Sequence, residues 1–492
     1  MELSRRSFLG ASLAGAAVLP SVASPAARVA VPSSKAELPY LNISDAAGLL
    51  KGKEISPVEL TQAILDRIEQ IDSRIHAFIT VAGDQALQAA RRAEQEIVAG
   101  KYRGPLHGIP VGVKDTHYTK GIKTTAGSPA LSDFIPSFDS TVVARLKQAG
   151  AVLVGKTNLP EFSMGGNTPS FNPWDLSRTP GGSSGGSAAA LAARMLTGAT
   201  GGDTSSSIRH PSTLCGVVGM KPTYGRVSRY GIAVISWSLD HVGPMTRTVE
   251  DNALMLNVLA GRDPMDDTSA DFPVPDYTRS LRAGVKGIRI GIPKAFLLEG
   301  YHPDVVKAYR EALEVFTRLG AKVTEVDMPP TLEPMNRGQR IIRICEAASY
   351  HELLAARRER YALEAPGRDS GRPRQEAEIG SMYTAVQYLR AQRLRKVFLK
   401  EITAVFQTFD VFVTPGKPAP AGEPASVQED FLSMFNCAGF PAIAVPSGFS
   451  TSPSGLPVGL QIVAKPFEEE TIYRAAYAYE SQTRWYEKRP SL

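Results

Sequence analysis

Two serine-rich turns on either side of a short apolar segment form the stretch best suited to chemistry. Residues 181–187 contain only glycine and serine, and residues 203–209 follow a Gly-Gly pair. Small residues let a backbone approach a ligand closely and leave amide N–H groups free to point at it. We therefore expect this stretch to hold an anion or a developing oxyanion rather than to act as a Gly/Ser linker.

A serine nucleophile needs a base, and histidine is a poor candidate here. No histidine follows His351, which argues against the Ser, acid, His order of α/β-hydrolases. Lys114 directly follows the apolar run of residues 109–113, at the carboxyl end of an expected strand. If Lys114 is buried, loss of its charge makes it a base; if it is exposed, it is a surface lysine paired with Asp115. The local sequence favours neither reading.

Further blocks of sequence resemble the amidase signature family. They are G-I-P-V-G-V-K-D at residues 108–115, then residues 155–165, 172–175, 435–442 and 455–463. The resemblance extends from about residue 46 nearly to the C-terminus and is loose over roughly residues 331–390. It implies an enzyme that cleaves an amide C–N bond through an acyl-serine intermediate, with no cofactor and no metal.

Carried over by motif, the resemblance assigns three catalytic residues. Ser207 is the expected nucleophile, Ser183 the bridging serine and Lys114 the terminal base. Ser184 is the alternative to Ser183. In the family the peptide bond entering the bridging serine is cis, which here is the bond between Gly182 and Ser183.

The turn that carries Ser207 has further expected roles. Its backbone N–H groups should hold the oxyanion, and they belong to Thr204, Ser205, Ser206 and Ser207. Asp203 and Arg209 are expected to brace the turn, the alternative being an ordinary surface ion pair.

The turn also departs from the family, and the substrate pocket is less certain than the catalytic residues. Much of the family has Gly-Gly where this chain has Ser205-Ser206, whose side chains would strain the turn if a positive φ were required. Substrate-binding residues are expected on variable loops, at Met164, Tyr230, Ile232 and Trp237.

Hydrophobic periodicity indicates how these residues are positioned. Ser56, Pro57 and Glu59 predict a capped helix start, and apolar strands alternate with helices along the chain. Residues 150–157 fit a phosphate-loop pattern, but their apolar centre predicts a strand instead. We expect an α/β fold, a single large α/β/α domain over residues 36–490 around a mixed, mostly parallel β-sheet.

The N-terminus predicts export. Arg5-Arg6 precede a short apolar run and small-residue cleavage sites, so residues 1–26 are interpreted as a twin-arginine signal peptide and the mature protein as periplasmic or secreted. The alternative is an uncleaved membrane anchor.

Three functions are considered, and the predicted export favours the first of them over the second. The leading expectation is a stand-alone enzyme that hydrolyses a small-molecule amide to a carboxylic acid and ammonia or an amine. The alternatives are the glutaminase subunit of a tRNA-dependent amidotransferase and a non-catalytic binding protein of the same fold. The net charge of +6 is mild, so no nucleic acid partner is expected; nor is stable membrane insertion, although a homodimer is possible.

Overall fold

Alternating strands and helices assemble around one sheet in the computed structural model, which describes residues 30–164, 168–233, 235–294, 298–360, 372–427 and 431–492. The strands are β1 Phe78–Val81, β2 Pro110–Lys114, β3 Val152–Thr157, β4 Gly198–Asp203, β5 Val218–Lys221, β6 His241–Thr246, β7 Arg289–Pro293, β8 Lys322–Val326, β9 Val411–Pro415, β10 Ala442–Thr451 and β11 Ser454–Ala464. The helices are α1 Ile43–Lys51, α2 Pro57–Ile75, α3 Gly83–Val98, α4 Thr141–Gln148, α5 Gly185–Ala192, α6 Arg209–Cys215, α7 Val249–Leu259, α8 Pro303–Arg318, α9 Leu332–Glu352, α10 Arg372–Met382, α11 Ala385–Val405, α12 Met434–Ala438 and α13 Glu469–Thr483.

The strands form a mixed sheet in the order β1-β3-β2-β4-β6-β5-β10-β11-β9-β7-β8. Parallel pairing joins β2 to β3 and β4, and β7 to β8 and β9. The other pairings among the described residues are antiparallel. The expected mixed α/β sheet is confirmed, but it is not mostly parallel. One reason is that only two residues connect β10 to β11, and so short a connection joins antiparallel strands.

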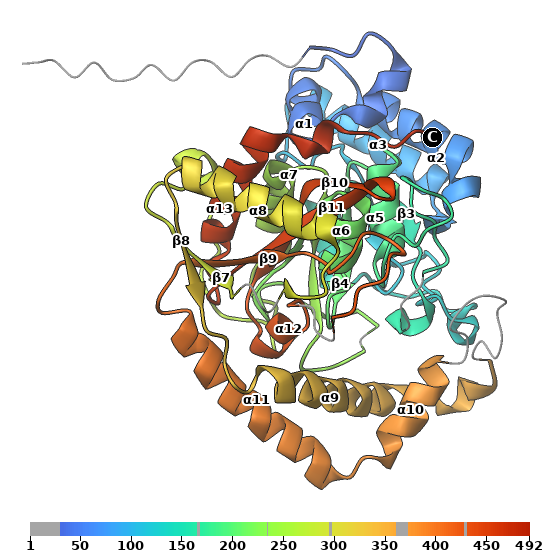
Figure 1. Cartoon of the computed structure of the whole chain (residues 1–492). Coiled ribbons are helices and arrows are strands. Elements are labelled where there is room, and N and C mark those ends of the chain that lie inside the picture. The colour runs from blue at the N-terminus through green and yellow to red at the C-terminus, as the bar shows by residue number, and fades with distance from the viewer. Residues whose placement is uncertain (1–29, 165–167, 234, 295–297, 361–371, 428–430) are drawn as a thin grey trace, which may run out of the picture. The chain divides into compact units, whose positions relative to one another are not determined.

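Helices cover both faces of this sheet (Figure 1). Successive residues of a strand point to opposite faces, and Leu153 and Val154 of β3 belong to different hydrophobic clusters. The Leu153 cluster includes residues of α7 and α13, whereas the Val154 cluster includes residues of α2 and α5. This double covering explains why the strands of the sheet centre read as apolar runs.

The strongest sequence signals predict the elements well. Ser56 caps α2, and its capping box with Glu59 is present. Hydrophobic periodicity also predicts helices near residues 85–98, 141–149 and 304–319, and these correspond to α3, α4 and α8. The segment that fits a phosphate-loop pattern contains β3, as the apolar residues predicted.

The region that resembles the family only loosely forms a helical layer. α9 contacts both α10 and α11, and the three helices lie together along one side of the molecule (Figure 1). The many charges and weak patterning of residues 357–374 predict a surface helix and loop, and residues 361–371 of that segment lie outside the described residues.

Residues 31–492 form one compact unit. The interpretation of residues 1–26 as an export signal falls outside the described residues and stays a prediction. Within the part of the chain that the structure describes, no helix is both long and apolar enough to span a membrane.

Candidate active site

Two parallel strands bring the expected base and the serine-rich turn together. β2 ends at Lys114 and β4 ends at Asp203, and because these strands are parallel neighbours their carboxyl ends share one edge of the sheet. The loop before α5 supplies Ser183, whose Oγ accepts a hydrogen bond from Lys114 Nζ at 2.6 Å. The sheet thus joins residues separated by 69 positions in the chain.

Lys114 has the environment of a buried base. Its side chain is only 1% exposed, and burial lowers its pKa to about 7 although the charges of Asp240 and Asp203 oppose this shift. The surface pairing with Asp115 is wrong, because Asp115 instead pairs with Lys156 at 3.1 Å. At neutral pH a substantial fraction of Lys114 is therefore a neutral amine.

The two adjacent serines have different partners. The peptide bond between Gly182 and Ser183 is cis, as the family resemblance implies. Ser184 Oγ instead donates to the carbonyl of Gly202 and accepts from its N–H, both at 3.2 Å. Lys114 therefore bonds to Ser183, the serine assigned by motif, and Ser184 is tied to the end of β4.

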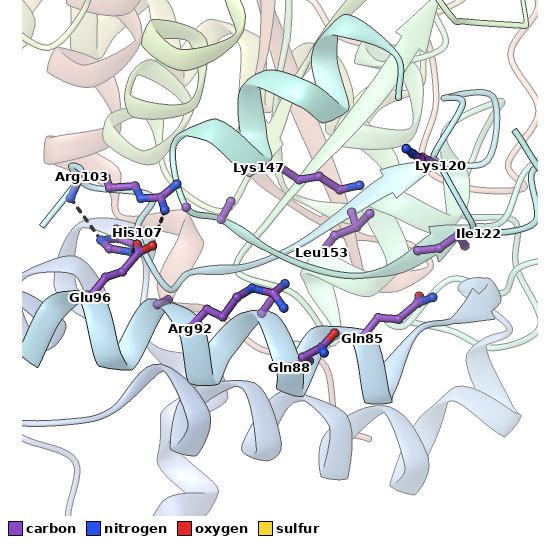
Figure 2. A pocket seen from close by; sticks show the side chains of 14 residues that line it. Gln85, Gln88, Arg92, Glu96, Arg103, His107, Lys120, Ile122, Lys147 and Leu153 are labelled. Atoms are coloured by element: carbon purple, nitrogen blue, oxygen red, sulfur yellow. Dashed lines mark hydrogen bonds and ion pairs between the residues drawn. The ribbon is translucent and has the colours of Figure 1, made fainter. Parts of the chain in front are cut away.

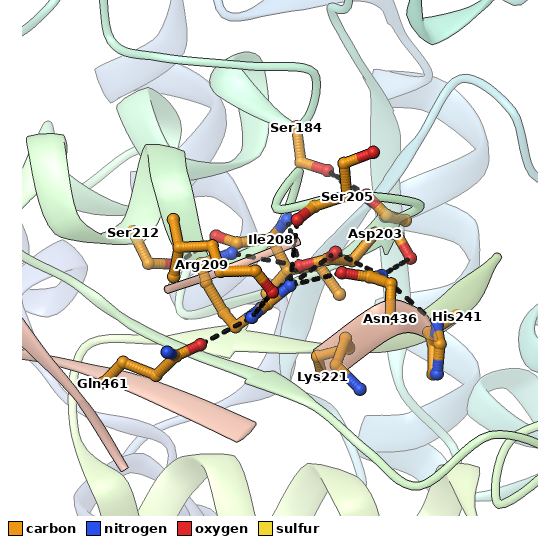
Figure 3. A network of polar contacts seen from close by, with 12 residues as sticks. Ser184, Asp203, Ser205, Ile208, Arg209, Ser212, Lys221, His241, Asn436 and Gln461 are labelled. Atoms are coloured by element: carbon orange, nitrogen blue, oxygen red, sulfur yellow. Dashed lines mark hydrogen bonds and ion pairs between the residues drawn. The ribbon is translucent and has the colours of Figure 1, made fainter. Parts of the chain in front are cut away.

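A buried ion pair braces the turn after β4 (Figure 3). Arg209 Nε lies 3.0 Å from Asp203 Oδ2, and both side chains are fully buried, which rules out an ordinary surface ion pair. Burial alone would raise the pKa of Asp203, but the charge and hydrogen bonds of Arg209 outweigh burial and hold that pKa below its usual value. Asp203 Oδ2 also accepts from the N–H of Ile208 at 3.1 Å, which closes the turn.

Two distant polar residues complete this brace. Asn436 Nδ2 donates to Asp203 Oδ1 at 2.8 Å, and Gln461 Oε1 accepts from Arg209 Nη1 at 2.5 Å. Sequence reasoning assigned neither residue a role. The signal was available, since each is a polar residue inside an apolar block of the family resemblance, and a buried amide needs partners.

The turn of residues 204–207 presents free backbone donors. Within the described residues, none of these four N–H groups donates a hydrogen bond, while the carbonyl of Ser207 accepts from Ser184 N at 3.1 Å. Ser207 is half-buried, and among the described contacts its hydroxyl makes no hydrogen bond to Ser183. Catalytic hydrogen bonds are often loose without substrate, so the roles of Ser207 and of these donors stay predictions.

The Ser205-Ser206 departure adds a contact instead of strain. Neither residue has a positive φ, so the turn does not require glycine there. Ser205 Oγ accepts a hydrogen bond of 2.7 Å from Gln339 Nε2, and its carbonyl accepts from Arg209 Nη2 at 3.3 Å. Gln339 lies on α9, so the helical layer reaches the turn of residues 204–207.

A small cavity of about 20 Å³ adjoins Lys114, with Thr204, Asp240 and Ile232 in its lining. Thr204 Oγ1 donates to Asp240 Oδ1 at 2.6 Å, which fixes one side of the cavity. Of the four expected substrate-binding residues, the structure places only Ile232 there.

The other three expected substrate-binding residues have different surroundings. Met164 is buried against Ile235 and Ala347, the Tyr230 ring packs against Phe138, and Trp237 is 60% exposed. Their part in binding stays a prediction.

Two buried histidines lie at this site, His117 beside Lys114 and His241 in the cavity lining. Burial lowers the pKa of His117 to about 3 and that of His241 well below its usual value, so both are neutral near pH 7. In the described part of the chain, no group of three or more His, Cys, Asp or Glu side chains is placed to hold a metal ion.

Fold and site together define an amide-cleaving class of enzyme, and comparison with known proteins agrees. The sequence profile of the family described as Amidase matches residues 59–473. The chain belongs to the amidase signature family and is an enzyme of that family.

Three members of the family illustrate which proteins this chain is similar to. The chain is 46% identical over 484 residues to the A subunit of glutamyl-tRNA(Gln) amidotransferase from Geobacter sp. (strain M21), covering 92% of this chain and 99% of the relative. The crystal structure of the corresponding protein from Thermotoga maritima is 34% identical, with a TM-score of 0.74 and coverage of 90% and 95%. The peptide amidase of Stenotrophomonas maltophilia is 32% identical, with a TM-score of 0.82 and coverage of 92% and 99%.

These relatives correct the leading expectation from sequence. A stand-alone enzyme acting on a free small-molecule amide is contradicted, because the full-length relatives of 41–46% identity are named as amidotransferase subunits. The expectation of a small-molecule amide as the partner is contradicted with it. The expectation was wrong because the motifs of the amidase domain are common to stand-alone amidases and amidotransferase subunits, so the choice between the two rested on the N-terminal residues alone.

Proposed function

We propose that this chain is the glutamine-hydrolysing subunit of a tRNA-dependent amidotransferase. The observation that carries the proposal is its 46% identity, over nearly the whole of both chains, to a protein named as the A subunit of glutamyl-tRNA(Gln) amidotransferase. Glutamine supplies the amide nitrogen, and a partner that holds glutamyl-tRNA uses the ammonia.

The site contains the parts needed for acyl transfer from glutamine. Neutral Lys114 takes a proton from Ser183, which takes the proton of Ser207 as Ser207 Oγ attacks the side-chain amide carbon. The same proton returns to the leaving nitrogen, which departs as ammonia. Water then hydrolyses the acyl-serine and releases glutamate. The Lys114–Ser183 hydrogen bond of 2.6 Å supports the first transfer.

Charge that develops on the amide oxygen is stabilised by the turn after β4. Its free N–H groups at residues 204–207 are fixed because the Asp203–Arg209 pair holds both ends of the turn. Fixed donors stabilise a transition state more than mobile ones because they need no reorganisation as charge forms.

Replacement of the Geobacter relative by this chain tests the function directly. This chain, expressed with the remaining subunits of the Geobacter amidotransferase, should release ammonia from glutamine and convert glutamyl-tRNA to glutaminyl-tRNA. A Ser207→Ala variant should do neither. If the native Geobacter protein is active in the same assay and this chain releases no ammonia from glutamine, the proposal fails.

Location provides a second test, because an exported chain would not meet aminoacylated tRNA. The twin-arginine prediction at Arg5-Arg6 therefore competes with the proposed function. Cell fractionation of the native chain and of the variant carrying Arg5→Lys and Arg6→Lys decides between them. An unprocessed native chain in the cytoplasm supports the amidotransferase, whereas a processed periplasmic chain whose export stops in the variant contradicts it.

A further inference from the structure

A groove of about 370 Å³ runs along α3, and the active site does not account for it. One face of α3 lines it through residues spaced three or four apart, including Gln85, Gln88, Arg92 and Glu96. Figure 2 shows these side chains on one side of the groove and those from β3, α4 and the loop at residues 120–122 on the other. None of the three expected catalytic residues lines it.

The groove is strongly cationic. Four basic side chains line it, from Arg92, Arg103, Lys120 and Lys147, against the single carboxylate of Glu96. Nearby cations that face no acid raise the free energy of the protein unless water or an anion compensates them. A net positive lining therefore points to an anionic ligand and argues against a metal cation.

The acids near the groove are already paired, at different places. Glu96 pairs with Arg103 at 2.5 Å and lies 3.0 Å from His107 Nε2, and Asp139 pairs with Lys147 at 2.8 Å. Burial lowers the pKa of His107 despite the charge of Glu96, so the imidazole adds no positive charge near pH 7. Neither acid is left to neutralise the other lysine and arginine of the groove.

Those two remaining cations carry the argument. Within the described residues, neither the Arg92 guanidinium nor the Lys120 ammonium makes a hydrogen bond or an ion pair, although both line the same cavity from different elements. Both side chains are exposed, and Figure 2 shows them apart, with Arg92 on α3 and Lys120 across the groove toward its other end, so each attracts an anionic group at its own place.

Part of the lining on each side of the groove is apolar. Ile122, Leu153 and Ala151 line the side opposite α3, and Ala89 and Ala93 line the α3 side. Figure 2 shows Leu153 and Ile122 lying across the groove from Arg92. A ligand that fills this space needs an uncharged part against these apolar side chains beside an anionic group for the cations.

We propose that this groove binds a nucleotide, with its phosphate at Arg92, the charge of Lys120 adding to the positive field of the groove, and its base over Leu153 and Ile122. The nucleotide is either free or part of an RNA strand, since both present the same phosphate and base. The inference does not rest on the proposed amide chemistry, because binding is measured without turnover.

Binding measurements on the full chain test this with matched pairs of variants. The test variant carries Arg92→Gln and Lys120→Gln. The control carries Arg91→Gln and Lys123→Gln, which remove neighbouring exposed cations that do not line the groove. Calorimetric titration with inorganic phosphate, adenosine 5′-monophosphate and a short single-stranded RNA gives the affinities. Each should weaken with rising salt, since the contacts are ionic.

The expected result is binding of the mononucleotide or of the RNA that weakens about tenfold or more in the test variant and little in the control. Binding of the RNA alone identifies the source as RNA, and comparable affinity for the mononucleotide identifies a free nucleotide. The proposal is overturned if neither binds, if inorganic phosphate binds as tightly as the nucleotide, or if both variants weaken equally. Ammonia release from glutamine should be unchanged in both variants, which separates failure here from failure of the proposed function.

Discussion

Two buried lysines on neighbouring strands have opposite surroundings. Lys114 ends β2, and Lys156 lies on β3 beside it, opposite Val113. Lys156 is fully buried but pairs with Asp115 at 3.1 Å and donates to the carbonyl of His117 and to Thr124 Oγ1. Lys114 is equally buried, but its hydrogen bond goes to the hydroxyl of a serine.

The difference between the two lysines shows what separates a structural lysine from one that can act as a general base. Burial lowers both pKa values, but for Lys156 the charge and hydrogen bond of Asp115 work directly against burial. For Lys114 the opposing carboxylates, Asp240 and Asp203, have other partners, and its pKa falls to about 7. Burial therefore predicts chemistry only when no carboxylate contacts the lysine.

The largest expected effect is the loss of activity when Ser207, the proposed nucleophile, is removed. Ser207→Ala should lower kcat by on the order of 10⁵-fold, because loss of a nucleophile removes the acyl-enzyme pathway. Labelling of the native enzyme with a fluorophosphonate, followed by peptide mapping, should place the label on Ser207. A label on Ser184 or Ser187 would contradict the assignment.

Replacement of each lysine by methionine tests the comparison itself. Lys114→Met should lower kcat by roughly 10³–10⁴-fold, as expected for a lost general base, and leave the Tm unchanged or higher. Lys156→Met leaves Asp115 buried without its cation, which should destabilise the fold by about 3–5 kcal/mol while the folded fraction stays active. Thermal unfolding and active-site titration separate the two outcomes. Loss of activity without loss of stability in Lys156→Met would contradict the structural role of Lys156.

The pH dependence should follow the Lys114 amine. The base is the neutral form, so activity is lost as pH falls through about 7 and is level well above it. At pH 6, kcat/KM should be about a tenth of its plateau value. The Lys156→Met variant should keep the same midpoint. A midpoint near 7 that disappears in His210→Ala would instead assign the base to histidine.

Local signals explain which parts of the fold were predictable. The helix start at Ser56 and the strand over Val152–Thr157 follow from capping and from apolar runs, which depend on nearby residues. The short strand Gly198–Asp203 was not predicted, because its composition is typical of a turn and its strand geometry comes from pairing with β2 and β6. The direction of strand pairing was also misjudged, since it depends on contacts distant in sequence.

The candidate site also contains residues that the sequence could predict and residues that it could not. Motif spacing named Lys114 and Ser183, and the structure joins them. Burial could not be known beforehand, so the local sequence left Lys114 equally consistent with a surface lysine. Asn436 and Gln339 reach the catalytic turn from distant elements, and no spacing rule connects them to it. Substrate-pocket residues were the least predictable, because loop conformation decides which side chains face the cavity.

The smallest expected effect concerns the hydrogen bond between Gln339 and Ser205, which lies in the turn that carries the proposed nucleophile. Gln339 is 6% exposed, and its Nε2 donates to Ser205 Oγ at 2.7 Å. Gln339→Ala should lower kcat about tenfold with little change in KM, because a turn held less firmly presents its N–H groups less well. Steady-state kinetics on glutamine measures the two constants separately.

A double-mutant cycle distinguishes positioning from a general loss of packing. Ser205→Gly removes the hydroxyl and restores the residue common in the family, so adding Gln339→Ala to it should have no further effect on kcat. Gln339→Glu replaces the donor by an acceptor, to which the Ser205 hydroxyl donates instead, and should recover part of the loss. If Gln339→Ala costs as much in the Ser205→Gly background as in the native chain, α9 acts through packing and the hydrogen bond does not position the turn. If neither change affects kcat, the Asp203–Arg209 pair and its other partners hold the turn without Gln339, and catalysis does not depend on the helical layer.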